Sequence, residues 1–278
     1  MSKNLIFQYM ITENVGKRKR VKQYDGPRDE LYRKSARLSW DSFARYAKLH
    51  NVTHHTSSKR VFTEGCGHNT DLYLFEVLRI VYDELYDQFD NVLYVDSDVI
   101  CNTQENIFDL VDGSFDMAGI YESEIISGRG NGGYNSWDRR PKSFKLLKNK
   151  YDRLGVPVIG TPPPAKPSKV AIFNTGVMLW TKEARLKARE TFDDWFAFYK
   201  DGVDNKDPRW VNNDQPFISS QLMKHNFRIK LLEQTWNDTP AHYNEYKDWR
   251  NKNFLHYTGG NGKVLMLDHH SINLFKYI

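Results

Sequence analysis

The sequence has little cysteine and no long apolar run. Its 278 residues include two cysteines, Cys66 and Cys101, whose spacing fits no disulfide framework. No apolar stretch approaches the roughly 20 residues that a bilayer crossing needs, and residues 1–10 lack the long apolar segment of a signal peptide. We therefore expect a cytoplasmic protein without a disulfide or a membrane span.

The chain also lacks a dominant charge of one sign. Its formal net charge is +5, and the basic residues are dispersed except for a run at 17–22. This distribution does not indicate a nucleic-acid groove. We expect the run to be a solvated loop, with anionic-partner binding or nuclear import as alternatives. Apolar residues make up 40% of the chain and aromatic residues 14%, which is typical of a globular protein.

Strand-like and helix-like segments follow one another along the chain. Apolar, β-branched and aromatic runs predict strands over 5–11, 52–56, 91–95, 115–121, 170–180 and 227–232. Apolar patterns and capping residues predict helices over 30–50, 72–86 and 182–199, and a further helix that opens at 212–216. The strand–helix–strand order at the amino-terminal end predicts an α/β fold with a largely parallel sheet. A small polar triplet, Asn174-Thr175-Gly176, interrupts the predicted strand over 170–180.

Two segments are too rich in glycine or proline for regular structure. They cover 127–133 and 155–169. We expect them to be binding loops or lids, because long loops inside compact domains often have that role. The second is not interpreted as a domain linker, since the residues after it complete the same site. The length then fits one domain over 1–278.

The predicted strand at 91–95 ends in two carboxylates one residue apart. It is continuously apolar, which indicates burial on both faces, and it leads directly into Asp96-Ser97-Asp98. Ligands of open α/β sheets bind outside the carboxyl ends of the strands, and carboxylate oxygens suit Mg²⁺ or Mn²⁺ better than zinc. The alternative is ordinary turn chemistry, in which the two acids bond local backbone amides.

Five short motifs follow one another between Leu72 and Lys263. They are Val95 to Asp98, Phe173 to Val177, Asp214-Gln215, Trp236-Asn237, and His256 with Gly259 and Lys263. In this order they resemble glycosyltransferase family 8, which includes glycogenin and bacterial lipopolysaccharide galactosyltransferases. The resemblance implies a GT-A (Rossmann-like) fold with a mixed, mostly parallel sheet flanked by helices. Residues 1–100 would form the nucleotide-binding half, and 101–278 the half for the sugar and the acceptor.

The resemblance also implies a reaction and its participants. A hexose would move, with retention of configuration, from a nucleotide-diphosphate sugar, expected to be a UDP-sugar, to a glycan or other hydroxyl acceptor. Mn²⁺ or Mg²⁺ would stabilise the departing diphosphate. The implied metal ligands are Asp96, Asp98 and His256.

Other residues receive roles from the same resemblance. Donor binding is expected at Asp96, Ser97, Asp98, Arg79, Gly259, Gly260 and Lys263. The two glycines compete for one role, because this chain has an extra residue between the motif histidine and its lysine. The sugar subsite and catalysis are expected at Asn174, Asp214 and Gln215. Trp236 and Asn237 are expected to border the acceptor.

Two retaining routes and three other functions stay open at this point. The acceptor attacks on the face that the diphosphate leaves, or a glycosyl group forms transiently on Asp214 or Gln215. A phosphatase-like hydrolase would usually place Thr or Ser soon after the second acid, where this chain has Val99. A sugar nucleotidyltransferase would have a glycine-rich phosphate loop after the first strand, which 12–16 does not provide. A non-catalytic sugar-nucleotide or glycan-binding protein would predict a broken set of metal ligands.

Overall fold

A computed structural model describes most of the chain. It covers residues 2–12, 24–67, 71–121, 141–155, 172–240 and 251–272. Three predictions lie outside these ranges wholly or largely: the solvated basic run at 17–22, the glycine-rich loop at 127–133, and the proline-rich loop, of which only Gly155 is described.

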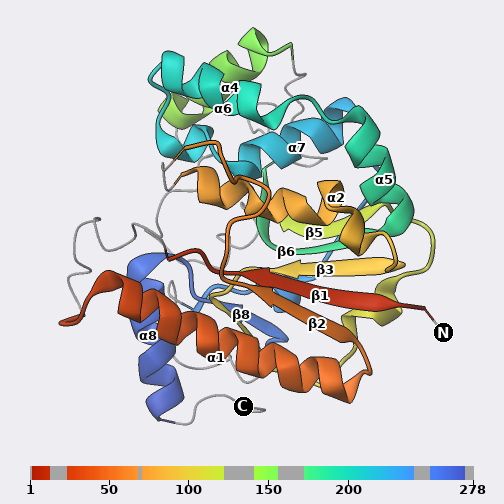
Figure 1. Ribbon diagram of the computed structural model, residues 1–278, viewed down its shortest axis with the longest axis vertical. Coiled ribbons are helices and arrows are strands. Elements are labelled where there is room, and N and C mark those ends of the chain that lie inside the picture. The colour runs from red at the N-terminus through yellow and green to blue at the C-terminus, as the bar shows by residue number, and fades with distance from the viewer. Residues whose placement is uncertain are drawn as a thin grey trace.

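A six-stranded sheet forms the centre of the molecule (Figure 1). Its strands are β1 (Asn4–Tyr9), β2 (Thr53–Ser57), β3 (Asn91–Val95), β5 (Met117–Tyr121), β6 (Phe173–Thr181) and β7 (Ile229–Leu231), in the order β2-β1-β3-β6-β5-β7. β6 pairs antiparallel with β3 and β5, whereas the other three pairings of the sheet are parallel. Among the described strands of this sheet, β6 alone therefore runs against the rest, and the predicted mixed, mostly parallel α/β architecture is confirmed.

Helices cover both faces of the sheet (Figure 1). On one side lie α1 (Arg28–Leu49) and α8 (Gly259–Ser271), and on the other α2 (Arg79–Tyr82), α4 (Pro141–Arg153), α5 (Lys182–Thr191), α6 (Trp195–Asp204) and α7 (Asp214–Lys224). Short 3-10 helices cover Leu72–Leu78, Glu84–Tyr86, Ile107–Leu110, Arg209–Val211 and Gln234–Trp236. Across the described ranges, none of the helices has the length and apolarity that would let it traverse a bilayer.

The strand residues divide between two apolar layers. Leu5 and Phe7 pack with the core under α2, α5 and α7, whereas Ile6 packs with Phe43 of α1 on the opposite face. Successive side chains of a strand point to opposite faces, so an uninterrupted apolar strand is what a sheet covered on both sides requires. The continuously buried β3 meets this requirement, as its sequence predicts.

A second, two-stranded sheet brings the carboxyl-terminal part to the end of β3. β4 (Val99–Cys101) pairs antiparallel with β8 (Phe254–His256), and Val99 is the direct partner of His256. Because β4 starts one residue after Asp98, this pairing fixes His256 beside the acidic turn.

Two predicted helices are each broken. Over 72–86, a 3-10 helix and one α-helical turn end at the extended residue Asp83, whose carboxylate caps the next short helix by accepting from the Leu85 amide at 3.1 Å. Over 182–199, α5 ends at Thr191, and Asp194 caps the separate helix α6. An aspartate that accepts from nearby amides starts a new helix in both places.

The predicted interruption at 170–180 is found in the pairing with β5, whose register shifts between Ala118 and Ile120, and not as a break in the strand. β6 runs without a break from Phe173–Thr181. Its first residues pair with β5, where Ile120 is the partner of Asn174, and its later ones also pair with β3. At the polar triplet itself, the Gly176 carbonyl accepts from the Asp96 amide and the Gly176 amide donates to Asn174 Oδ1, so these backbone groups are bonded outside the regular ladders.

Candidate metal and donor site

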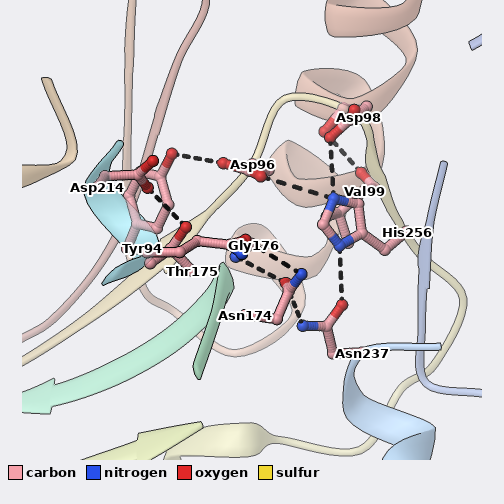
Figure 2. A network of polar contacts seen from close by, with 12 residues as sticks. Tyr94, Asp96, Asp98, Val99, Asn174, Thr175, Gly176, Asp214, Asn237 and His256 are labelled. Atoms are coloured by element: carbon pink, nitrogen blue, oxygen red, sulfur yellow. Dashed lines mark hydrogen bonds and ion pairs between the residues drawn. The ribbon is translucent and has the colours of Figure 1, made fainter. Parts of the chain in front are cut away.

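Two carboxylates and one imidazole meet at the carboxyl end of β3 (Figure 2). His256 Nε2 lies 3.2 Å from Asp98 Oδ1 and 3.5 Å from Asp96 Oδ2. One ligand atom from each residue lies within 4.8 Å of the others. The three residues predicted as metal ligands are thus brought together by the fold, although His256 is distant from the acids in sequence.

Backbone bonds hold the acidic turn on both sides. The Asp96 amide donates to the Gly176 carbonyl of β6 at 2.8 Å, and the Asp98 carbonyl accepts from the Tyr257 amide at 2.8 Å. Below the turn, the buried Gln8 amide donates to the Asp96 carbonyl at 3.3 Å. The turn is therefore anchored to β1, to β6 and to the residue after β8, and the direction of its carboxylates does not depend on the turn sequence alone.

The pKa shifts of Asp96, Asp98 and His256 show how the charges of the site are balanced. Desolvation and the neighbouring Asp98 charge raise the pKa of Asp96 above its ordinary value. Burial would also raise the pKa of Asp98, but Lys263 and His256 outweigh it and lower that pKa. Burial disfavours charge on His256, yet the two carboxylates raise its pKa above the usual value. Cationic partners thus compensate the paired carboxylates here, which is the role that a bound divalent cation also fills.

This donor set fits a divalent cation. Asp96 and Asp98 offer hard carboxylate oxygens, which suit Mg²⁺ and Mn²⁺, and the imidazole of His256 adds a nitrogen that Mn²⁺ accepts. The Asp96 side chain keeps 35% of its surface exposed, whereas those of Asp98 and His256 keep 11% and 3%. The cluster therefore has an open side next to Asp96.

Lys263 lies at the same cluster. Its ammonium group forms an ion pair with Asp98 Oδ2 and lies 4.7 Å from the centre of the Tyr32 ring. The lysine belongs to the first turns of α8, which begins at Gly259 with a φ of +72°. Gly259 contributes to the wall of the adjoining cavity; Gly260 is not among the described residues of that wall. Of the two predicted glycines, the structure places Gly259 next to the site.

A cavity of about 320 Å³ adjoins the acidic turn. Asp96, Ser97, Asp98 and Lys263 form one part of its wall. Other parts come from residues that the sequence does not single out, namely Tyr9, Tyr32, Tyr73, Tyr94, Arg28 and Arg209. The signal available for Tyr9 is its place at the end of β1, the strand next to β3, and Tyr94 lies in the predicted strand β3 itself. The other four are brought in by helices, and no local pattern predicts their place at the cavity.

Asn174, Asp214 and Gln215 also come together, where β6 lies beside the start of α7. Asp214 Oδ2 accepts from the Thr175 hydroxyl at 2.6 Å, and Asn174 Nδ2 donates to Gln215 Oε1 at 3.4 Å. Burial, with a further contribution from the Asp96 charge, raises the pKa of Asp214 to about 7. In Figure 2, Asp214 and Thr175 lie on the Tyr94 side of Asp96, and His256 lies on the other side.

Solved structures with a similar fold are known, although they differ widely from this chain in sequence. No protein-family model matches the chain, and no curated protein does. A solved glycosyltransferase involved in the glycosylation of the major capsid of PBCV-1 is similar over 96% of this chain and 99% of its own, with 15% identity and a TM-score of 0.52. The bifunctional glycosyltransferase WbbM is similar over 96% of this chain and 50% of its own, with 12% identity and a TM-score of 0.54. The chain has a GT-A glycosyltransferase fold.

Within this GT-A fold, Arg79 does not take the place expected of a donor-binding residue. The guanidinium donates to the Ser57 hydroxyl and to Asp83 Oδ2, both at 3.2 Å, and lies over the rings of Phe7 and Tyr86. It is 5% exposed and is not among the described residues that line the cavity. Its contacts join β2 and the segment before β3, so its position is explained by packing.

Trp236 and Asn237 also differ from their expected place beside an acceptor. Trp236 is 6% exposed and packs edge-to-face on Phe254 of β8, with ring centres 5.1 Å apart. Asn237 is fully buried, and its Oδ1 lies 3.0 Å from His256 Nδ1. The Trp-Asn motif thus supports the strand that carries His256, and its indole face is covered.

Proposed function

We propose that the chain is a metal-dependent, retaining glycosyltransferase that moves a hexose from a nucleotide-diphosphate sugar, a UDP-sugar, to a glycan or other hydroxyl acceptor. The observation that supports this most directly is the meeting of Asp96, Asp98 and His256 beside the cavity at the end of β3. In a GT-A fold, this is the edge where an open α/β sheet binds its ligand.

Each group has a part in the proposed reaction. Asp96, Asp98 and His256 would hold Mn²⁺ or Mg²⁺, and that ion supplies charge stabilisation for the departing diphosphate. Lys263 adds a compact positive charge at the same place. The cavity volume, about 320 Å³, lies at the lower end of the range of about 300–1,000 Å³ for small-molecule sites.

In this proposal, the sugar and the nucleotide base of the donor bind at opposite parts of the site. The ring of Tyr32, beside Lys263, offers a flat surface to the nucleotide base, whereas Tyr9 lies on the Asp214 side. Asp214 and Gln215, together with Asn174, form the sugar side and include the two candidates for a covalent intermediate. We propose one domain over 1–278, with the metal ligands supplied from both of its halves.

The test is donor turnover in the presence of Mn²⁺. A panel of nucleotide-diphosphate sugars is incubated with the protein, and release of nucleoside diphosphate is measured with and without EDTA. We expect turnover of a UDP-hexose that EDTA abolishes, and loss of that turnover in Asp98→Ala and in His256→Ala while the melting curve stays cooperative. Asp204→Asn, a change at an exposed acid of α6, is the matched control and should turn over normally.

Other outcomes point to other functions. Full turnover in EDTA, or in both metal-ligand variants, would rule out the metal-dependent mechanism. Donor binding with no turnover toward any hydroxyl acceptor or water would favour a non-catalytic binding protein. Release of pyrophosphate from a nucleoside triphosphate and a sugar phosphate would instead indicate a nucleotidyltransferase.

A further inference from the structure

A chain of buried hydrogen bonds links β6 to the side of His256 that faces away from the carboxylates (Figure 2). The Gly176 amide donates to Asn174 Oδ1 at 2.9 Å, and Asn237 Nδ2 donates to the same oxygen at 2.9 Å. Asn237 Oδ1 lies 3.0 Å from His256 Nδ1. Asn174, Asn237 and His256 are 4%, 0% and 2% exposed, so bulk water does not compete for these bonds.

The direction of every hydrogen bond in this series follows from the first one, which the Gly176 amide donates. A backbone amide can only donate, so the Asn174 atom that faces Gly176 must be the side-chain oxygen. The oxygen of a side-chain amide can only accept a hydrogen bond, so the Asn237 atom that faces Asn174 Oδ1 must be the NH₂ nitrogen. Asn237 then presents its oxygen to His256, and Nδ1 must carry the hydrogen. This assignment rests on one backbone group and not on a choice between amide rotamers.

The orientation matters because of what the other ring nitrogen faces. A neutral imidazole with its hydrogen on Nδ1 has its lone pair on Nε2, the atom 3.2 Å from Asp98 Oδ1 and 3.5 Å from Asp96 Oδ2. A lone pair that faces two carboxylates is repelled unless a positive charge lies between them, which is either a proton on Nε2 or a bound cation. Nε2 can bind a metal only in the tautomer with the hydrogen on Nδ1, and this is the tautomer that the series of hydrogen bonds enforces.

We propose that Asn237, oriented by Asn174, is a positioning residue that holds His256 with its Nε2 lone pair directed at the bound cation. This inference rests on the metal dependence proposed above. It gives Asn174 a role other than contact with the sugar, and it gives Asn237 a role other than contact with the acceptor.

The backbone around Asn237 makes the inference testable. The Asp238 amide donates to the Phe254 carbonyl at 3.0 Å, and the His256 amide donates to the Asp238 carbonyl at 2.6 Å. These bonds hold the segment against β8 independently of the Asn237 side chain. A substitution at Asn237 should therefore remove the contact with His256 and leave the strand in place.

The experiment measures Mn²⁺ affinity without nucleotide, from the electron paramagnetic resonance signal of free Mn²⁺. We expect Asn237→Leu to weaken binding about 10- to 100-fold, the usual effect of losing a partner of a ligating histidine. Asn237→Asp keeps an acceptor for Nδ1–H but loses the donor to Asn174 Oδ1, so its affinity should lie between that of Asn237→Leu and that of the wild type. Asn91→Leu is the matched control, since Asn91 is a buried asparagine at the opposite end of β3, and its binding should equal that of the wild type.

A second measurement covers the case in which Asn237→Leu does not fold. In the Mg²⁺-loaded wild type, nitrogen-15 chemical shifts should show His256 with a hydrogen on Nδ1 and none on Nε2; the reverse tautomer overturns the inference. Equal losses in Asn237→Leu and Asn237→Asp would assign Asn237 to packing alone and overturn it as well. Wild-type affinity in Asn237→Leu overturns the inference but leaves the proposed function intact, whereas a wild type that binds no Mn²⁺ overturns both.

Discussion

Gly176 and His256 are so close that no side chain fits between them. A Cβ atom at position 176 would lie 2.2 Å from Cε1 and 2.6 Å from Nδ1 of His256, and 2.8 Å from Asn174 Oδ1. The strand cannot retreat easily, because the Gly176 carbonyl accepts from the Asp96 amide. The glycine thus allows His256, the proposed metal ligand, and the acidic turn to contact the same residue of β6.

Gly176→Ala should therefore damage the metal site more than the fold. The added methyl group displaces the imidazole, and we expect Mn²⁺ affinity to fall at least about tenfold, as when the support of a ligand is lost. Overpacking should lower the free energy of unfolding by about 1–3 kcal/mol. Titration of Mn²⁺ and urea denaturation measure the two effects.

Gly119→Ala is the control for this change. Gly119 lies in β5, next to β6, and its added Cβ would first meet Met117 Sδ at 3.2 Å, a flexible side-chain atom. This variant should bind Mn²⁺ like the wild type. Unchanged affinity in Gly176→Ala would show that His256 adapts to the methyl group, and the steric argument would fail.

The parts of the site that sequence predicts are those set by local pattern or by shared motifs. The apolar run into Asp96 and Asp98 is a local signal, and β3 confirms it. The sequence itself gives no physical reason to place His256 there, because the pairing of β4 with β8 that brings it is a long-range contact. Only the resemblance to known glycosyltransferases predicted that proximity.

The expected and observed positions differ where packing decides the direction of a side chain. Arg79 and Trp236 lie in the parts of the chain where donor and acceptor contacts were expected, yet both side chains point into the core. The break at Asp194 had a visible signal, because an aspartate before an apolar segment is a helix start. Apolar periodicity alone does not detect such a start within a longer helical pattern.

The raised pKa of Asp214 predicts how the free energy of unfolding of the metal-free protein changes with pH. Burial raises its pKa from 3.8 to about 7, so the folded state holds a proton that the unfolded state releases. The stabilisation is complete below about pH 3.8 and is lost as the pH rises to about 7. At about 1.4 kcal/mol per pKa unit, it amounts to up to about 4 kcal/mol.

Asp214→Asn removes this titration. Urea denaturation between pH 4.5 and 8 should show a wild-type free energy of unfolding that declines relative to that of the variant. Asp204→Asn, at an exposed site, should follow the wild-type curve. Parallel curves for the wild type and Asp214→Asn would mean that Asp214 is ionised throughout this pH range.

Substitutions at Trp236 test whether its side chain belongs to the core or contacts the acceptor. Its indole is buried against Phe254 and packs in the cluster with Val99 and Leu232, so Trp236→Ala should lower the free energy of unfolding by about 3–5 kcal/mol. Trp236→Phe keeps an aromatic ring in the cluster and should lose less. If the core assignment is right, Trp236→Phe leaves KM for the acceptor unchanged once an acceptor is identified. A raised acceptor KM at wild-type stability would instead place the indole at the acceptor, as the motif predicted.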